Sequence, residues 1–176
     1  MPLFGNKDGS GGPSFEFEER AGGKVAGVDE AGRGPWAGPV VAASVLLNRD
    51  RVPAGLNDSK KLSATRRSEL FDLLMESAEV GIGQASVEEI DRLNILQASL
   101  LAMCRAVAAM PVQPDHCLID GNRMPALEIP ATCLVKGDAR SFSVAAASIV
   151  AKVTRDRIMR DLAAGFPEYG WERNAG

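Results

Sequence analysis

Three short apolar segments of this 176-residue chain each lead to a carboxylate, and each has a glycine close by. The segments are residues 25–29, with Asp29 and Glu30, residues 115–120, with Asp120, and residues 132–135, with Asp138. In an α/β sheet, parallel strands bring their carboxyl ends to one edge, where glycine lets the chain turn without steric cost. We therefore expect these four carboxylates to lie together at one edge of a sheet.

The rest of the pattern alternates strand-like and helix-like segments, as is typical of an α/β fold. The nearly all-apolar sequence PVVAASVLL predicts a second buried strand. A short glycine-rich connection joins it to the first strand, which favours an antiparallel pair. The spacing of SVEE is that of a capping box and starts a short helix. The expected strands are residues 25–29, 39–47, 80–85, 115–120 and 132–135, and the expected helices are residues 63–78, 86–93, 96–110 and 142–164.

Residues 1–23 are rich in glycine and charge and show no sustained period. This composition is typical of a mobile tail, and we expect only one short ordered piece within it, near residues 15–19. The remaining residues, 24–176, are enough for a single domain with its own core. We therefore expect one catalytic domain behind a flexible N-terminal tail.

Composition argues against several classes of site. A single histidine, His116, nearly excludes a nucleophile–histidine triad, and the three cysteines show no Cys-x-x-Cys spacing for zinc. The net charge of −3 argues weakly against a general nucleic-acid binder, although a local basic face is compatible with it. No apolar run reaches the length of a membrane span, and no apolar signal core is present, so we expect a cytoplasmic protein without membrane contact.

Carboxylates gathered at one edge repel one another unless a cation lies between them. Hard oxygen ligands without a histidine or cysteine set favour Mg²⁺ or Mn²⁺, which commonly bind substrate phosphates as well. Two such ions about 4 Å apart can clamp the attacking and leaving oxygens of a phosphoryl transfer. The acids therefore predict metal-dependent chemistry on a phosphate ester.

A glycine-flanked arginine, made of Gly32, Arg33 and Gly34, follows the first acid pair. The glycines leave the backbone free to approach a ligand closely, although such a turn is also ordinary loop chemistry. Lys60 and Lys61 stand in the turn sequence LNDSKKL, either as solvated loop residues or as contacts to a phosphodiester backbone. The acids later in the chain favour the functional interpretation of the Gly-Arg-Gly loop.

Five motifs in this order resemble bacterial ribonuclease HII: GVDEAGRGPWAGPVV, LNDSKKLS, LIDGN, KGD and SVAAASIVAKVTRDR. The resemblance runs from about residue 24 to the last residue and implies a ribonuclease H-like fold, a mixed five-stranded sheet flanked by helices. It also implies an endonuclease that hydrolyses RNA in RNA–DNA hybrids and nicks duplex DNA 5′ of single ribonucleotides. The product ends would be a 5′-phosphate and a 3′-hydroxyl. We expect such a protein to bind these duplexes as a monomer.

The same resemblance implies four catalytic acids that hold two Mn²⁺ or Mg²⁺ ions: Asp29, Glu30, Asp120 and Asp138. Asp29 is expected between the ions, with Asp138 at one of them and the other two acids at the other. The Gly32–Arg33–Gly34 loop resembles the element that senses a ribonucleotide 2′-hydroxyl, largely through main-chain groups. Candidate contacts to backbone phosphates are Lys60, Lys61, Lys136 and Lys152.

The chain departs from the family pattern at its C-terminus. It stops at Gly176, where the family continues with a tyrosine that packs against the deoxyribose beside the ribonucleotide. We therefore expect a C-terminally truncated domain, with substrate grip and junction specificity affected.

Two other classes of protein fit part of the pattern. Sugar and acetate kinases bind ATP phosphates through Asp-Gly loops but need a second domain, and a non-catalytic nucleic-acid-binding module leaves four acids at matching strand ends unexplained.

Overall fold

Five strands form one mixed sheet in the computed structural model, which describes residues 12–35 and 37–171. The strand order is β3-β2-β1-β4-β5. At the centre, β1 (Val25–Ala31) is antiparallel to β2 (Val40–Leu47) and parallel to β4 (His116–Asp120). At the edges, β3 (Ala78–Ala85) is antiparallel to β2, and β5 (Ala131–Leu134) is parallel to β4. The expected mixed α/β sheet is confirmed.

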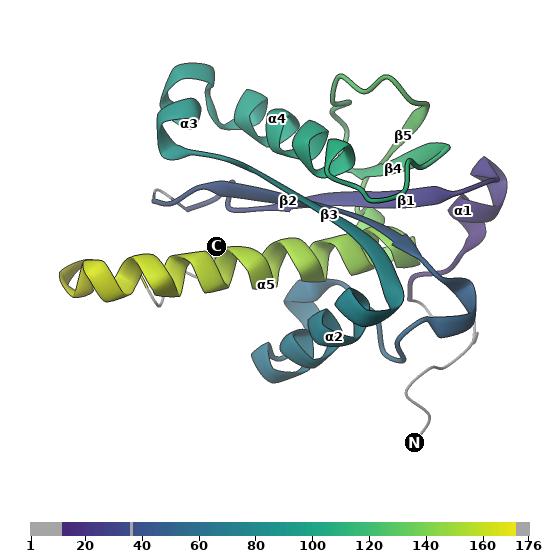
Figure 1. Cartoon of the computed structure of the whole chain (residues 1–176), viewed down its shortest axis with the longest axis horizontal. Coiled ribbons are helices and arrows are strands. Elements are labelled where there is room, and N and C mark those ends of the chain that lie inside the picture. Colours follow the sequence, from purple (N-terminus) through teal and green to yellow (C-terminus); the bar gives the residue numbers. More distant parts are fainter. Residues whose placement is uncertain (1–11, 36, 172–176) are drawn as a thin grey trace.

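Helices cover both faces of this sheet, as Figure 1 shows. One face carries α4 (Ile95–Ala108), with the short α3 (Val87–Leu93) beside it. The other carries the long α5 (Phe142–Gly165), against which α2 (Ala64–Ser77) packs. The expected capping box starts α3: the Ser86 hydroxyl accepts from the Glu89 N–H, and the Glu89 carboxylate accepts from the Ser86 N–H. Short 3-10 turns are η1 (Arg49–Arg51), η2 (Ser59–Lys61), η3 (Gly137–Ala139) and η4 (Pro167–Tyr169).

Small residues let α5 approach the central strand closely. Its run Ala145, Ala146 and Ala147 is fully buried. At Gly27 of β1, an added β-carbon would collide with the main chain of Ser143 and Val144 at the start of α5. Helix and strand therefore touch backbone to backbone at this point, just after the turn that carries Asp138.

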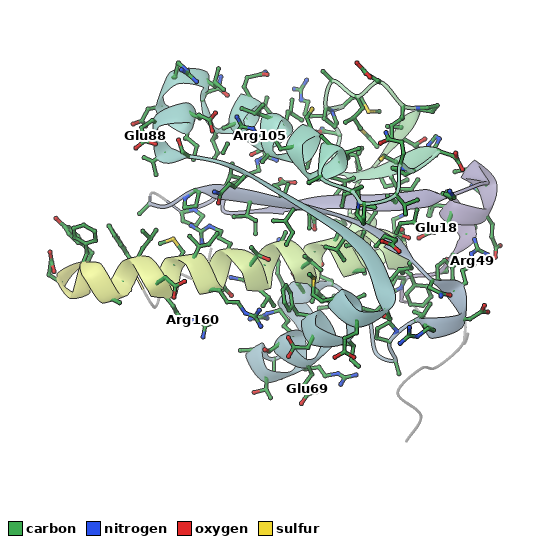
Figure 2. All side chains as sticks on the ribbon, in the orientation of Figure 1. Glu18, Arg49, Glu69, Glu88, Arg105 and Arg160 are labelled. Atoms are coloured by element: carbon green, nitrogen blue, oxygen red, sulfur yellow. The ribbon has the colours of Figure 1, made fainter. Side chains whose placement is uncertain are left out.

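The described part of the N-terminal segment contains one short helix. Residues 16–21 form the helix α1 (Glu16–Ala21), which matches the short ordered piece expected near residues 15–19 but extends beyond it. Glu18 of this helix, labelled in Figure 2, is buried. Its Oε1 accepts hydrogen bonds from the Ser141 hydroxyl (2.7 Å) and the Ser143 N–H (2.9 Å) at the start of α5. The ordered piece is therefore a short helix, and this charged sequence without a period is held by contacts with distant residues. Residues 1–11 lie outside the described part of the chain.

The described helices include none that is both long and apolar enough to cross a membrane. Of the C-terminal sequence FPEYGWERNAG, the last five residues, 172–176, lie outside the described part of the chain.

Candidate active site

The register of the parallel pair β1–β4 brings two acids side by side. Val28 of β1 is paired with Ile119 of β4, and the next residues of the two strands are Asp29 and Asp120. Side chains alternate between the two faces of a strand. Asp29 therefore lies on the same face as Gly27, which touches α5. Glu30 lies on the face of Val28, which packs against residues of α4. Adjacent Asp29 and Glu30 thus diverge to the two faces of one strand end.

A short turn adds the third aspartate position. Oδ1 of Asp120 accepts a hydrogen bond from the N–H of Gly137 (2.7 Å), which opens the η3 turn containing Asp138. Lys136, just before this turn, has a left-handed backbone (φ 56°), which directs the chain sharply after β5. The carboxylate of Asp120 therefore fixes the turn that presents Asp138.

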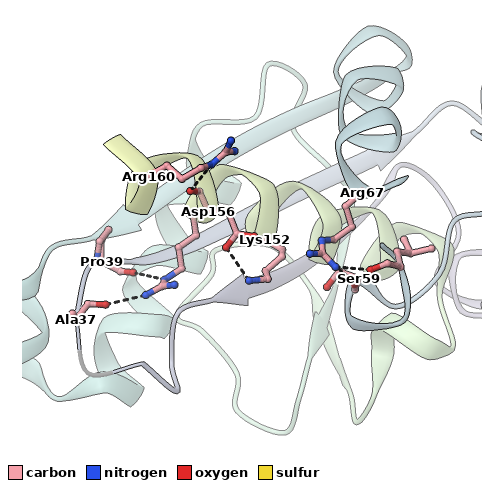
Figure 3. Close-up of polar contacts among 9 residues, drawn as sticks. Ala37, Pro39, Ser59, Arg67, Lys152, Asp156 and Arg160 are labelled. Atoms are coloured by element: carbon pink, nitrogen blue, oxygen red, sulfur yellow. Dashed lines mark hydrogen bonds and ion pairs between the residues drawn. The ribbon is translucent and has the colours of Figure 1, made fainter. Parts of the chain in front are cut away.

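All four predicted acids line one pocket of about 470 Å³. The Gly32–Arg33–Gly34 loop and the side chains of Lys60 and Lys152 also line it. Lys152 is held by an ion pair with Asp156 one turn later on α5 (2.8 Å; Figure 3). Two other predicted lysines, Lys61 and Lys136, are exposed and are not part of the pocket lining.

The electrostatics of the pocket favour a bound cation. Burial raises the pKa of Asp29 well above its ordinary value, and repulsion from Glu30, Asp120 and Asp138 raises it further. Burial also raises the pKa of Glu30, against the opposing effect of the Arg33 guanidinium 3.1 Å away. A cation among these carboxylates would relieve the repulsion that disfavours their charged forms.

The donor set suits a hard divalent cation, because it consists of carboxylate oxygens without histidine or cysteine. Within residues 12–35 and 37–171, however, no three such side chains already converge as a metal cage. Two of the acids are engaged by neighbouring groups: Asp29 Oδ1 accepts from the Glu30 N–H (2.7 Å), and Glu30 Oε1 accepts from Arg33. The residues fit a cation in chemistry and location, and their side chains would have to rotate to bind one cation together.

Several pocket residues were not predicted from the sequence. Ser59, Ile95 and Ser148 line the pocket, and burial together with the neighbouring carboxylate of Asp58 raises the pKa of Asp138. Asp58 lies in the LNDSKKL motif, where only the lysines were singled out. Its carboxylate caps η2 by accepting from the Lys60 N–H (2.9 Å). A further acid in this motif is the sequence signal that could have placed it beside the other carboxylates.

Comparison with known proteins agrees with this geometry. The family model described as Ribonuclease HII matches residues 26–176. Ribonuclease HII of Jannaschia sp. is 60% identical over 166 residues, which cover 94% of this chain and 83% of that protein. Ribonuclease HII of Ruegeria pomeroyi is 64% identical over 154 residues, which cover 87% of this chain and 66% of that protein.

The fold agrees as well. The crystal structure of ribonuclease H2 from Pyrococcus horikoshii OT3 superposes with a TM-score of 0.71 at 30% identity, covering 83% of this chain and 78% of that chain. The ribonuclease H-like fold expected from the resemblance is thereby confirmed, and the kinase alternative is set aside. This chain belongs to the ribonuclease HII family of metal-dependent endoribonucleases.

Proposed function

We propose that this chain hydrolyses the RNA strand of RNA–DNA hybrids and nicks duplex DNA on the 5′ side of single embedded ribonucleotides. The products carry a 5′-phosphate and a 3′-hydroxyl. The observation that carries the proposal is one pocket that combines the four strand-end acids, a glycine-rich loop and two lysines. Such a pocket offers metal ligands, a close main-chain approach and phosphate contacts in one place.

The four acids are the proposed metal ligands: Asp29, Glu30, Asp120 and Asp138. Two Mn²⁺ or Mg²⁺ ions held by these acids would supply Lewis-acid activation of the attacking water and would neutralise the charge that develops on the leaving 3′-oxygen. Asp29, the most buried of the four at 6% exposure, is the proposed shared ligand. The hydrogen bond from Gly137 orients Asp120 and ties the end of β4 to the η3 turn that carries Asp138.

The remaining pocket residues act on the nucleic acid. Lys152, oriented by Asp156, and the exposed Lys60 are placed to contact phosphates next to the scissile bond. Gly34 has no atom within 4 Å of where a β-carbon would stand, so a sugar can approach its main chain directly. Main-chain contact at this point is the proposed means of sensing the 2′-hydroxyl. Lys61 and Lys136, outside the pocket lining, are proposed as contacts to more distant phosphates.

A single chain carries the complete set of acids, so a second copy is not needed to build the site. We therefore propose a monomer as the active form, working in the cytoplasm, where bacterial DNA lies.

The test is cleavage of an end-labelled DNA duplex that contains one ribonucleotide. The chain is expected to nick it 5′ of the ribonucleotide with Mn²⁺ or Mg²⁺ and to leave it intact in EDTA. The product ends are checked with DNA ligase, which joins only a 5′-phosphate to a 3′-hydroxyl. The downstream product strand should be ligated to an added strand that ends in a 3′-hydroxyl.

Asp120→Asn is the matched active-site variant, because an asparagine oxygen can still accept from Gly137 while the charge is lost. It is expected to reduce cleavage to background with an unchanged circular dichroism spectrum. Asp91→Asn, on the exposed surface of α3, is the control and should cut like the wild type. Undiminished nicking by Asp120→Asn would refute the ligand assignment.

A further inference from the structure

A buried arginine of α5 holds the loop that connects β1 to β2. Arg155 is fully buried, although it belongs to a stretch of α5 that is rich in basic residues. Its Nε donates a hydrogen bond to the carbonyl of Pro39 (3.2 Å), and its Nη2 donates to the carbonyl of Ala37 (2.9 Å; Figure 3). One guanidinium therefore binds two main-chain oxygens at the end of the loop that begins with Gly32.

The same side chain also contacts the beginning of this loop. Gly32 has φ +104°, and a β-carbon there would collide with Nε and Cδ of Arg155. Gly38, with φ +84°, lies near it as well: a β-carbon would stand 3.5 Å from Nη2 and would collide with Sδ of Met159. The guanidinium is thus enclosed by the two ends of one loop.

These contacts separate the roles of the two glycines in the Gly-Arg-Gly motif. The absent side chain of Gly32 makes room for Arg155, inside the protein. The absent side chain of Gly34 leaves open space, on the exposed side. Of the two glycines, Gly34 is the exposed one with open space beside its main chain, and the buried Gly32 joins it to Arg155.

Burying a guanidinium is costly, and a planar fork compensates for the cost best when it donates several hydrogen bonds at once. Lysine carries the same charge on a single tetrahedral nitrogen and cannot reproduce the pair of bonds to Ala37 and Pro39. The arrangement accordingly depends on arginine rather than on a positive charge alone.

We propose that Arg155 is a positioning residue for ribonucleotide recognition, because its guanidinium fixes the Gly32–Pro39 loop in the shape that presents the Gly34 main chain to the sugar. This inference rests on the proposed function. Arg155 is not among the residues that line the pocket and acts through the loop.

The experiment compares wild type with Arg155→Lys on two duplexes of the same sequence. One contains a single ribonucleotide and is the substrate, and the other is all DNA and serves as a competitive inhibitor. The Ki of the all-DNA duplex divided by the KM of the substrate measures the preference for the sugar. We expect Arg155→Lys to raise KM at least fivefold while Ki stays within twofold, since phosphate contacts are unchanged.

Neither KM nor Ki depends on the fraction of molecules that are folded, so a merely structural role would lower the apparent kcat and leave both constants alone. That result, or a parallel rise in both constants, would overturn the inference. Arg160→Lys, an exposed arginine on the same helix, is the control and should keep the wild-type ratio.

If Arg155→Lys does not fold, Gly38→Ala disturbs the contact between Arg155 and the loop from the loop side. This variant must also lower the ratio of Ki to KM. An unchanged ratio in that variant overturns the inference. A wild-type chain that fails to cut the ribonucleotide duplex refutes the proposed function itself. Normal cutting with an unchanged ratio refutes only the role of Arg155.

Discussion

Substituting Gly27 by alanine adds one methyl group where β1 and α5 touch backbone to backbone. The new β-carbon would collide with the carbonyl group of Ser143 and the nitrogen of Val144. These are main-chain atoms in the first turn of a 24-residue helix, so no side-chain rotation can relieve the contact. The helix or the strand has to move.

The size of the effect follows from this contact. Non-bonded carbon atoms pack at about 3.5–4.0 Å, so α5 must retreat from β1 by about 1 Å or more. Overpacking of this kind costs up to about 3 kcal/mol, which for a chain of this size lowers Tm by roughly 6–12 °C. The same movement separates Asp29 on β1 from Asp138 just before α5, and a misplacement of about 1 Å can reduce catalysis by about 100-fold.

Thermal denaturation and the duplex-nicking assay measure the two effects. Gly165→Ala is the matched control, because this residue of α5 has no atom within 4 Å of an added β-carbon, and alanine favours a helix. We expect that control to match or exceed the wild-type Tm with normal activity. A Gly27→Ala protein that melts within about 2 °C of the wild type would contradict the close packing inferred here, since even about 1 kcal/mol shifts Tm by roughly that amount.

Two further perturbations address the pocket charges. Because burial and like charges raise the pKa of Asp29, its protonated form favours the folded metal-free protein below the ordinary carboxyl pKa, and this contribution is lost as pH rises through the raised value. Melting curves in EDTA should therefore show a wild-type Tm that falls with rising pH relative to the Tm of Asp29→Asn. Equal pH profiles of the two proteins would contradict the raised pKa of Asp29. Arg33→Met frees Glu30 from an ion pair and removes a cation from the pocket. Calorimetric titration should therefore show Mn²⁺ binding about two- to fivefold tighter, which corresponds to the free energy of a solvent-exposed ion pair. Unchanged or weaker binding would show that Arg33 does not compete with the metal.

The strands and the four acids could be predicted because their signals are local. Apolar runs such as that of residues 39–47 leave few options other than a buried strand, and strand-end acids need only the parallel order of β1, β4 and β5 to meet. The capping box at Ser86 was equally local.

What could not be predicted depends on distant partners. Glu18 lies in a charged helix without an apolar stripe. Its burial follows from hydrogen bonds to Ser141 and Ser143, which lie more than 120 positions later in the chain. Adjacent Lys60 and Lys61 look alike in sequence, but only Lys60 lines the pocket, because η2 turns their side chains apart. Arg155 lies in sequence among other basic residues of α5, although its spacing from Lys152 and Met159 places it on the inward side.

Glu18 also affects where this protein can be divided. The family match begins at residue 26, and a fragment cut there would lack the whole of α1. Such a fragment would retain every predicted ligand but leave Ser141 and Ser143 without the carboxylate that ties the start of α5 to the preceding chain. Loss of one helix cap commonly costs about 0.5–2 kcal/mol, and here it falls three residues after Asp138. The unit that folds therefore begins before the residues that the family model matches, and the boundary chosen for a recombinant protein decides how firmly the turn with Asp138 is held.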